Sequence, residues 1–289
     1  MRRSALCEGA TNHDTGSFMH DTSRPRPDFD KYRLYLDSVQ SPDEDTEFFD
    51  QLYADARGHE RPPQIFREDF CGAFANCCAW VRRGQERIAY GIDVDPEPLQ
   101  YGRTQYLPLL TEAQQRRVHP LQEDVLSPGL PLADVISAHN FSYCVFKERK
   151  TLLAYFRNAL ATLRTDGIFT LDCLGGSMYQ EANEEEVIHE EEGFSYFWAQ
   201  ESFDPLTYHA VFHIHFKRNG EEKREKVFTY DWRLWTIPEL REALLDAGFS
   251  KVNVYWEGTT PEGTGDGMYV PVEKGEECES WIAHLVALK

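Results

Sequence analysis

The sequence predicts an α/β fold with a mostly parallel sheet, helices on both faces, and an insertion of antiparallel strands near the C-terminal half. Two observations carry this prediction. Between residues 64 and 174, short apolar segments of β type alternate with helical segments, which is typical of parallel strands joined by helical crossovers. Between residues 176 and 235 the alternation stops, and strand-like segments follow one another without a helix, which is typical of antiparallel strands.

The N-terminal region divides into two parts. Residues 1–28 are polar, contain the stretch SRPRPD and show no periodicity, so we expect a mobile arm. Residues 29–62 show helical periodicity, with Tyr32, Tyr35 and Leu36 on one face. We therefore expect residues 29–289 to form a single domain that begins with a helical cap.

The alternating region carries its own start and stop signals. Asp95 can cap the second helix, and Pro96 suits its first helical position. Gly167 separates the third helix from the strand that follows. The expected strands are 64–66, 87–94, 117–125, 133–141 and 168–174, and the expected helices are 73–81, 95–107 and 151–163.

The insertion, residues 176–235, begins with the acidic stretch EEEVIHEEE, which we expect to be a solvated loop. Strands follow at 194–202, 209–217 and 225–235, with an Asn-Gly turn between the last two. We expect these strands to form a lid. The α/β pattern then resumes with a capping box of Thr236 and Glu239, a helix that ends at Gly248, and strands at 251–257 and 280–289.

The charge of the chain limits its partners. It has 30 basic and 49 acidic residues and a formal charge of -19. So acidic a surface repels phosphate backbones and anionic lipids. We therefore expect a small-molecule partner, and neither nucleic acid nor a membrane.

The cysteines and the apolar segments indicate a compartment. Seven cysteines, an odd number with no CxxC pair, favour a reducing environment. No stretch reaches the ~18 to 20 apolar residues of a membrane helix, and the first residues lack the apolar centre of a signal peptide. We expect a cytoplasmic protein.

Polar residues follow the predicted parallel strands. Glu68 comes just after the first, and Asp93, Asp124 and Asn140 lie at the ends of the next three. In an open parallel sheet, ligands bind at the carboxyl ends of the strands, and a carboxylate after the second strand suits a ribose diol. Gly72 lets the backbone come close to a ligand at the start of a helix, where free N–H groups are available.

This order of residues resembles the class I S-adenosylmethionine-dependent methyltransferases, over residues 65–174 and more loosely to the C-terminus. In that family the first strand leads into an E/D-x-G-x-G-x-G turn. The matching stretch here is EDFCGAF, in which Glu68, Cys71 and Gly72 fit, and Phe70 and Phe74 replace the outer glycines. The resemblance implies a Rossmann-like fold and S-adenosylmethionine as the cofactor.

The resemblance also implies roles for single residues. Asp93, with Val94 beside it, matches the acid that binds the ribose, and Asp124 matches the acid that meets the adenine amino group. Glu68 would position the methionyl end of the cofactor or the turn itself. The implied cofactor-binding residues are Arg67, Glu68, Cys71, Gly72, Asp93, Val94, Asp124, Val125 and Asn140.

Some candidate residues have two interpretations. Arg67 could reach the cofactor carboxylate, or it could pair with Glu68 or Asp69. Cys71 is expected to contribute its backbone rather than to act as a nucleophile, because no His partner is near it in the sequence. The HIH segment, residues 213–215, could hold a metal, but it has no third ligand at a recognisable spacing, and we expect no metal site.

We expect the acceptor to bind between the helical cap, the fourth strand and the insertion. Aromatic faces attract cations and a guanidinium suits a carboxylate, which together favour an amino acid or a related amine. Because YDWR alternates faces, Tyr230 and Trp232 point one way and Arg233 the other. Alternatively, the two aromatic residues belong to the core and Arg233 pairs with an acid of 184–192. The candidate acceptor-binding residues are Tyr35, Asn140, Tyr143, Tyr230, Trp232 and Arg233.

The predicted function is S-adenosylmethionine-dependent N- or S-methylation of an amino acid or amine-like small molecule. A nicotinamide-dependent oxidoreductase is disfavoured, because CGAFAN stands where G-x-G-x-x-G is needed. A non-catalytic cofactor-binding or regulatory protein and a protein methyltransferase remain as alternatives. The N-terminal arm and Cys7 could serve a homodimer.

Overall fold

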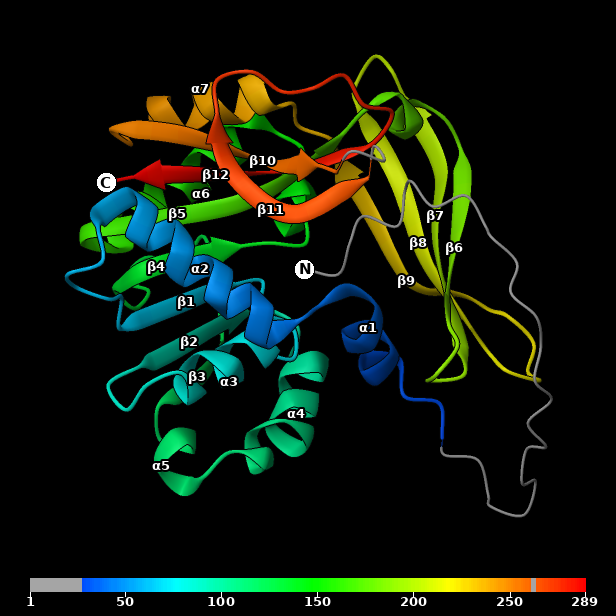
Figure 1. Ribbon diagram of the computed structural model, residues 1–289, viewed down its shortest axis with the longest axis horizontal. Coiled ribbons are helices and arrows are strands. Elements are labelled where there is room, and N and C mark those ends of the chain that lie inside the picture. Colours follow the sequence, from blue (N-terminus) through cyan, green and yellow to red (C-terminus); the bar gives the residue numbers. More distant parts are fainter. Residues whose placement is uncertain (1–27, 261–263) are drawn as a thin grey trace.

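The computed structural model describes residues 28–260 and 264–289, and its centre is an eight-stranded sheet (Figure 1). Strands β3, β2, β1, β4 and β5 are parallel, β12 is antiparallel to β5, and β10 again runs in the direction of the first five. The predicted mostly parallel sheet is therefore confirmed. In sheet order the strands are β11 (Gly265–Val272), β10 (Lys251–Thr259), β12 (Trp281–Leu288), β5 (Leu163–Gly175), β4 (Ala133–Ala138), β1 (Ile65–Asp69), β2 (Ile88–Asp93) and β3 (Val118–Gln122).

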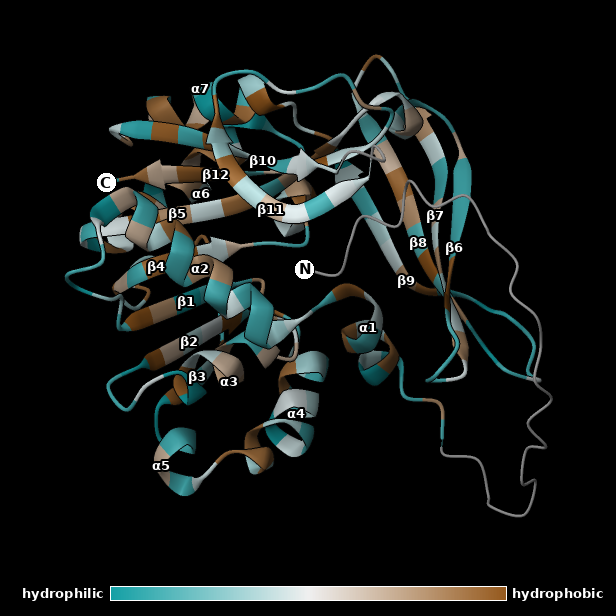
Figure 2. Ribbon diagram, in the orientation of Figure 1, coloured by the Kyte–Doolittle hydropathy of each residue, from teal (hydrophilic) through white to brown (hydrophobic). Residues whose placement is uncertain are grey.

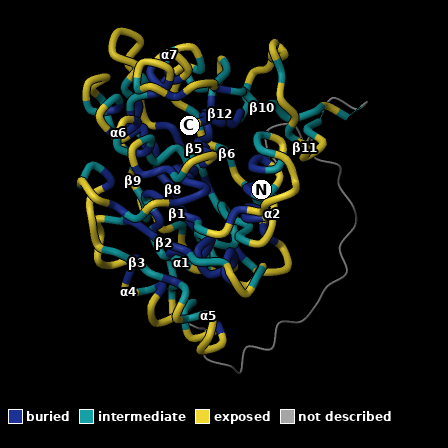
Figure 3. The backbone as a smooth tube through the Cα atoms, turned by 90° about the vertical axis from the view of Figure 1, so that its left-hand side faces the viewer, coloured by how far each residue is buried: buried dark blue, intermediate teal, exposed yellow. Residues whose placement is uncertain are grey.

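Helices cover both faces of this sheet. Phe49 of α2 and Trp80 of α3 are buried on one face, and Phe156 of α6 and Leu244 of α7 are buried on the other. The strands between them are mainly apolar (Figure 2), and the buried residues concentrate there (Figure 3). Helices on both faces are thus confirmed. The helices are α1 (Lys31–Val39), α2 (Pro42–Arg57), α3 (Ala75–Arg82), α4 (Pro96–Gln105), α5 (Glu112–Gln115), α6 (Arg149–Thr162) and α7 (Ile237–Ala247), with short 3-10 turns at Leu107–Leu109, Ser142–Val145 and Ser177–Gln180.

The predicted helix signals are present. The side chain of Asp95 accepts a hydrogen bond from the N–H of Glu97 at the start of α4. Thr236 and Glu239 form the capping box of α7, and Gly248 ends that helix with a left-handed conformation. Within the described residues, no helix combines the length and the apolar character that crossing a membrane requires.

The insertion forms a second sheet of four antiparallel strands, in the order β6-β7-β8-β9. The prediction of a solvated loop at 184–192 is wrong for residues 184–189, because Asn183–His189 forms the edge strand β6. Glutamate is depleted in strands, so three consecutive Glu residues conceal a strand in the sequence. The other strands are β7 (Phe194–Asp204), β8 (His209–Arg218) and β9 (Arg224–Arg233).

Helix α1 lies between the two sheets. Its side chains Leu34, Tyr35 and Val39 pack on one face of the second sheet, which we call the inner face and which carries Ile214. At its other end, Lys31 forms an ion pair with Glu97 of α4 at 2.7 Å. Figure 1 shows the second sheet beside the edge of the main sheet at which the parallel strands end.

Some predictions about the chain's organisation stay untested. Residues 1–27 lie outside the described residues, and with them almost all of the expected arm and Cys7. The expected cap at 29–62 contains α1 and α2, and the expected lid at 176–235 contains the second sheet. Whether the second sheet moves as a lid stays a prediction. Strand β11 was not predicted, because its Gly265, Gly267 and Pro271 are poor strand formers.

Candidate functional site

The turn after β1 has the backbone of a glycine-rich turn with only one glycine. Phe70, Gly72 and Phe74 all have positive φ angles, 59°, 51° and 50°. A left-handed conformation costs a residue with a side chain roughly 1–2 kcal/mol. Both phenylalanines offset that cost by packing, since Phe74 is fully buried and the ring of Phe70 lies 5.6 Å from that of Tyr155. The aromatic residues that replace the outer glycines therefore keep the turn's shape.

Asp93, at the end of β2, closes this turn. One of its carboxylate oxygens accepts a hydrogen bond from the N–H of Gly72 at 2.7 Å, and the other accepts one from the N–H of Asp95 at 2.9 Å. Burial raises the pKa of Asp93. A Cβ added to Gly72 would meet nothing within 4 Å, so the space beside the turn is open. Val94, the next residue, is 61% exposed.

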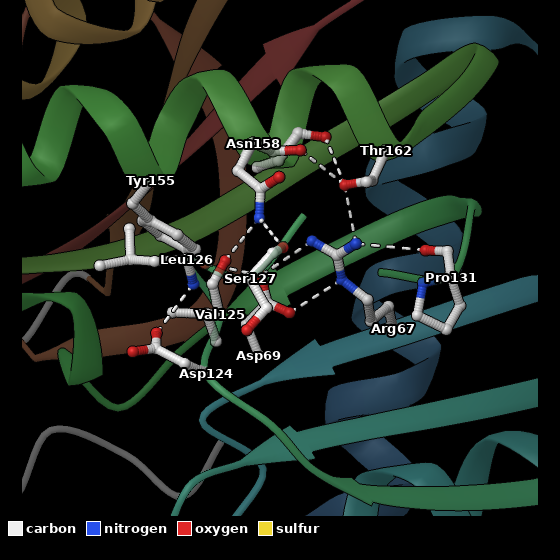
Figure 4. Close-up of polar contacts among 11 residues, drawn as sticks. Arg67, Asp69, Asp124, Val125, Leu126, Ser127, Pro131, Tyr155, Asn158 and Thr162 are labelled. Carbon is white, nitrogen blue, oxygen red and sulfur yellow. Dashed lines mark hydrogen bonds and ion pairs between the residues drawn. The ribbon is translucent and has the colours of Figure 1, made fainter. Parts of the chain in front are cut away.

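The loop after β3 holds Asp124 and Val125. The Asp124 carboxylate accepts a hydrogen bond from the N–H of Leu126 at 2.8 Å. Asn158 of α6 donates to the carbonyl oxygens of Val125 and Ser127, at 2.7 and 2.9 Å (Figure 4). The loop is thereby fixed beside β2, because the N–H of Glu123 also donates to the carbonyl oxygen of Asp93 at 3.0 Å.

Arg67 does not lie at the open turn. Its guanidinium makes two hydrogen bonds to the Asp69 carboxylate, at 2.8 and 3.1 Å, and both side chains have no exposed surface. Further bonds join Arg67 to Thr162 and Asp69 to Tyr155, both on α6 (Figure 4). Of the two interpretations of Arg67, the structure shows the ion pair, and we remove Arg67 from the cofactor-binding residues because no ligand can reach its buried guanidinium.

Glu68 lies on the opposite face of β1 and is also buried. Its carboxylate accepts a hydrogen bond from Asn76 at 2.8 Å and one from Cys77 at 3.5 Å, both in α3. Burial raises the pKa of Glu68 to about 8. These contacts join the end of β1 to α3. Burial also raises the pKa of the Cys71 thiol well above its ordinary value, which argues against a nucleophile.

The turn after β4 depends on Asp172, a residue that the sequence did not single out. The two Asp172 carboxylate oxygens accept hydrogen bonds from the N–H groups of Asn140 and Phe141, at 2.8 and 2.9 Å. Both of those residues have positive φ angles. Burial raises the pKa of Asp172 to about 7. The available signal was one acid within the apolar strand IFTLDCL.

Two predicted acceptor-binding residues belong to the core. Tyr143 is 1% exposed, and its hydroxyl donates to the carbonyl oxygen of Asp172 at 2.7 Å. Trp232 is 3% exposed, with its ring centroid 5.5 Å from that of Phe212. Neither side chain is available to an acceptor, so the core interpretation of Trp232 holds and the prediction for Tyr143 is corrected.

Arg233 lies on the outer face of the second sheet. It forms an ion pair with Glu239 at 3.0 Å, donates to the carbonyl oxygen of Lys147 at 3.0 Å, and its guanidinium lies 3.7 Å from the centre of the Trp235 ring. Its partner is therefore the capping-box acid rather than an acid of 184–192. We remove Arg233 from the acceptor site. Tyr35 and Tyr230 remain, and both pack in the apolar cluster on the inner face.

Histidines also form two buried pairs, and His189 is buried as well. His139 directly follows β4, with Nε2 3.2 Å from the Thr170 hydroxyl and its ring stacked on that of His284. In the HIH segment, His213 contacts Glu201, and His215 lies 3.6 Å from Glu184. Among the described residues there is no group of three or more His, Cys, Asp or Glu side chains that could hold a metal.

Comparison with known proteins places the fold. No family model and no curated protein match the chain. A solved S-adenosylmethionine-dependent methyltransferase from Clostridium acetobutylicum is 13% identical and matches with a TM-score of 0.64, covering 89% of this chain and 96% of that one. The amino pentose methyltransferase CalS10 from Micromonospora echinaspora is 14% identical, with a TM-score of 0.62 over 92% of this chain and 99% of its own.

The sugar N-methyltransferase KedS8 from Streptoalloteichus is likewise 14% identical, with a TM-score of 0.59 over 96% of this chain and 99% of that one. At these identities the likeness establishes the fold. The chain has the fold of the S-adenosylmethionine-dependent methyltransferases, as the EDFCGAF turn and the acids after the strands predicted.

Proposed function

We propose that this protein is an S-adenosylmethionine-dependent methyltransferase that methylates a nitrogen atom of a small-molecule amine. One observation carries the proposal. At the carboxyl ends of β1 and β2, the Gly72 turn borders open space, and the Asp93 carboxylate is hydrogen-bonded to that turn. Backbone and carboxylate are therefore presented together where an open parallel sheet binds its ligand.

The residues at this edge suit the cofactor. A carboxylate has about four acceptor positions, so Asp93 can hold the ribose hydroxyls while it keeps its two backbone hydrogen bonds. The exposed Val94 offers apolar surface to the adenine, Asp124 offers an acceptor to its amino group, and Gly72 gives room for the methionyl end. When bound, the cofactor supplies a methyl group on a positively charged sulfur.

The protein's own contribution is to orient the acceptor and to exclude water. Such a transfer needs no nucleophile from the protein, which agrees with the buried Cys71 thiol and its raised pKa. The inner face of the second sheet and helix α1 would form the acceptor chamber, with Tyr35 and Tyr230 in its wall.

Two observations support an amine without a carboxylate as the acceptor. Arg233 is on the outer face and paired with Glu239, so the clamp expected for an acceptor carboxylate is lost. The aromatic wall expected for an amine is retained in Tyr35 and Tyr230. Both CalS10 and KedS8 are named as methyltransferases of amino sugars or sugar nitrogen, which supports an amine over an amino acid.

Calorimetry and label transfer test this function. We expect S-adenosylhomocysteine to bind and NAD not to bind, and we expect labelled S-adenosylmethionine to methylate an amine in a panel of amino sugars, alkylamines, amino acids and thiols. Binding of NAD without S-adenosylhomocysteine would overturn the proposal. Cofactor binding without transfer to any acceptor would instead favour the non-catalytic alternative.

A further inference from the structure

Strand β6 places one carboxylate on the inner face of the second sheet. Glu185 pairs with Trp198, and Trp198 pairs with Ile214. Directly paired residues of antiparallel strands lie on the same face. Because Ile214 packs against α1, Glu185 lies on the inner face as well. Its neighbours Glu184 and Glu186 lie on the outer face, since successive side chains of a strand alternate.

The adjacent Glu184 and Glu185 differ in their partners. Glu184 forms an ion pair with Lys223 at 2.6 Å and lies 3.6 Å from His215. Glu185 is half-buried, has no hydrogen bond or ion pair among the described residues, and its pKa is raised by burial alone. Removing a carboxylate from water without giving it a partner costs free energy, and a bound cationic group would offset that cost.

Aromatic side chains lie beside this carboxylate. Trp198 is its direct pairing partner on β7, and Tyr196, two residues along that strand, lies on the same face. The ring of Tyr230 on β9 lies 6.0 Å from that of Trp198. The unpaired carboxylate therefore lies among electron-rich rings, the surroundings in which proteins bind ammonium groups.

We propose that Glu185 and the aromatic side chains beside it bind the amine of the acceptor as an ammonium group, with Glu185 as its counter-charge. Before methylation the nitrogen gives one proton to the Glu185 carboxylate, which frees the lone pair that attacks the methyl group. This inference rests on the proposed function and adds the charge of the acceptor and the residue that selects it. Glu185 is an acceptor-binding residue that the sequence concealed within an expected solvated loop.

The test uses two probes of equal size, cyclohexylammonium chloride and the neutral cyclohexanol. Their affinities are measured by calorimetry on the full chain saturated with S-adenosylhomocysteine. Glu185→Gln removes the inner charge, and Glu186→Gln removes an equal charge from the outer face of the same strand. We expect the wild type and Glu186→Gln to bind the ammonium probe about ten-fold more tightly than cyclohexanol, and Glu185→Gln to lose that preference.

Several results would overturn the inference: equal affinity of the wild type for both probes, binding of neither probe, or an undiminished preference in Glu185→Gln. Comparison of the two probes on the wild type does not depend on a variant that folds. Affinity for S-adenosylhomocysteine separates the two proposals. If the wild type binds S-adenosylhomocysteine but does not prefer the ammonium probe, only the inference about Glu185 fails. If the wild type does not bind S-adenosylhomocysteine, the proposed function fails.

Discussion

The carboxyl edge of the main sheet and the inner face of the second sheet, which we propose as the cofactor and acceptor sites, are built differently. At the edge, Asp93, Asp124 and Asp172 each accept hydrogen bonds from backbone N–H groups. On the inner face, Glu185 has no such bond among the described residues, and Trp198 and Tyr196 of β7 lie beside it. A substitution at the edge should therefore disturb the fold and ligand binding together, whereas one on the inner face should disturb recognition alone.

The largest effect is expected beneath the edge, at the pair of Arg67 and Asp69. Arg67→Met leaves the Asp69 carboxylate buried without its countercharge, which we expect to lower the free energy of unfolding by about 3 to 5 kcal/mol. Urea denaturation measures this loss. The double variant Arg67→Met, Asp69→Leu is the control, because it removes both charges and should recover part of the stability. A single variant as stable as the wild type would contradict a structural ion pair.

Asp93→Ala should weaken binding of S-adenosylhomocysteine by about 1.5 to 3 kcal/mol, the cost of leaving hydroxyl groups without their acceptor. Because Asp93 also holds the Gly72 N–H, the same variant should lose some thermal stability. Calorimetry and a melting curve measure the two quantities. Unchanged affinity would mean that the ribose does not bind at Asp93. The variant Asp95→Ala, which changes the next acidic residue along the chain, serves as the control.

Glu68 predicts a dependence of stability on pH. Its pKa in the folded chain is about 8, against an ordinary 4.5, so the folded state holds a proton that the unfolded state releases. The stability that this group contributes is complete below pH 4.5 and is lost as the pH rises through 8. We expect the unfolding free energy to fall from pH 6.5 to 8, and Glu68→Gln to reduce that slope by up to about 1.4 kcal/mol per pH unit.

Asp172, with its pKa raised to about 7, contributes in the same direction, so the slope of Glu68→Gln should not vanish. His139 has the opposite sign, because its pKa is lowered to about 3 and its effect acts below its ordinary 6.5. Urea denaturation across the pH range separates these contributions. Identical slopes in the wild type and Glu68→Gln would refute the buried, protonated Glu68.

The smallest effect is expected on the outer face. Arg233→Gln breaks a partly exposed ion pair with Glu239, which should lower the free energy of unfolding by no more than about 1 kcal/mol. Since Arg233 lies on the outer face, away from the proposed acceptor site, the Michaelis constant of the acceptor at saturating cofactor should not change. A large rise in that constant, with the protein folded, would restore Arg233 to the acceptor site.

The sequence predicts the main sheet far better than the second. Strands and helices alternate with clear caps at Asp95 and Thr236, and the acids that follow the strands are set by the chain's order alone. The sequence left the ion pair of Arg67 as one of two interpretations, because the first strand was expected to end at residue 66. With the strand extended to Asp69, residues 67 and 69 share one face and can pair.

The second sheet was harder because its partners come from distant parts of the chain. Alternation in YDWR shows that Trp232 and Arg233 lie on opposite faces, but not which face is inner. That choice is made by packing against α1 and the main sheet. Strand β6 was missed for another reason. Its charged side chains are tolerated because it is an edge strand, whose outer face contacts solvent and basic residues.

The two phenylalanines in the turn after β1 have a further consequence. A turn with three glycines has high conformational entropy in the unfolded chain, and this entropy is lost when the turn forms. Phe70 and Phe74 have fewer accessible conformations, and their rings are already anchored against α6 and in the core. The conformational entropy of the turn is therefore lost mostly during folding. A ligand that binds at Gly72 would meet a preorganised turn and would not have to order it.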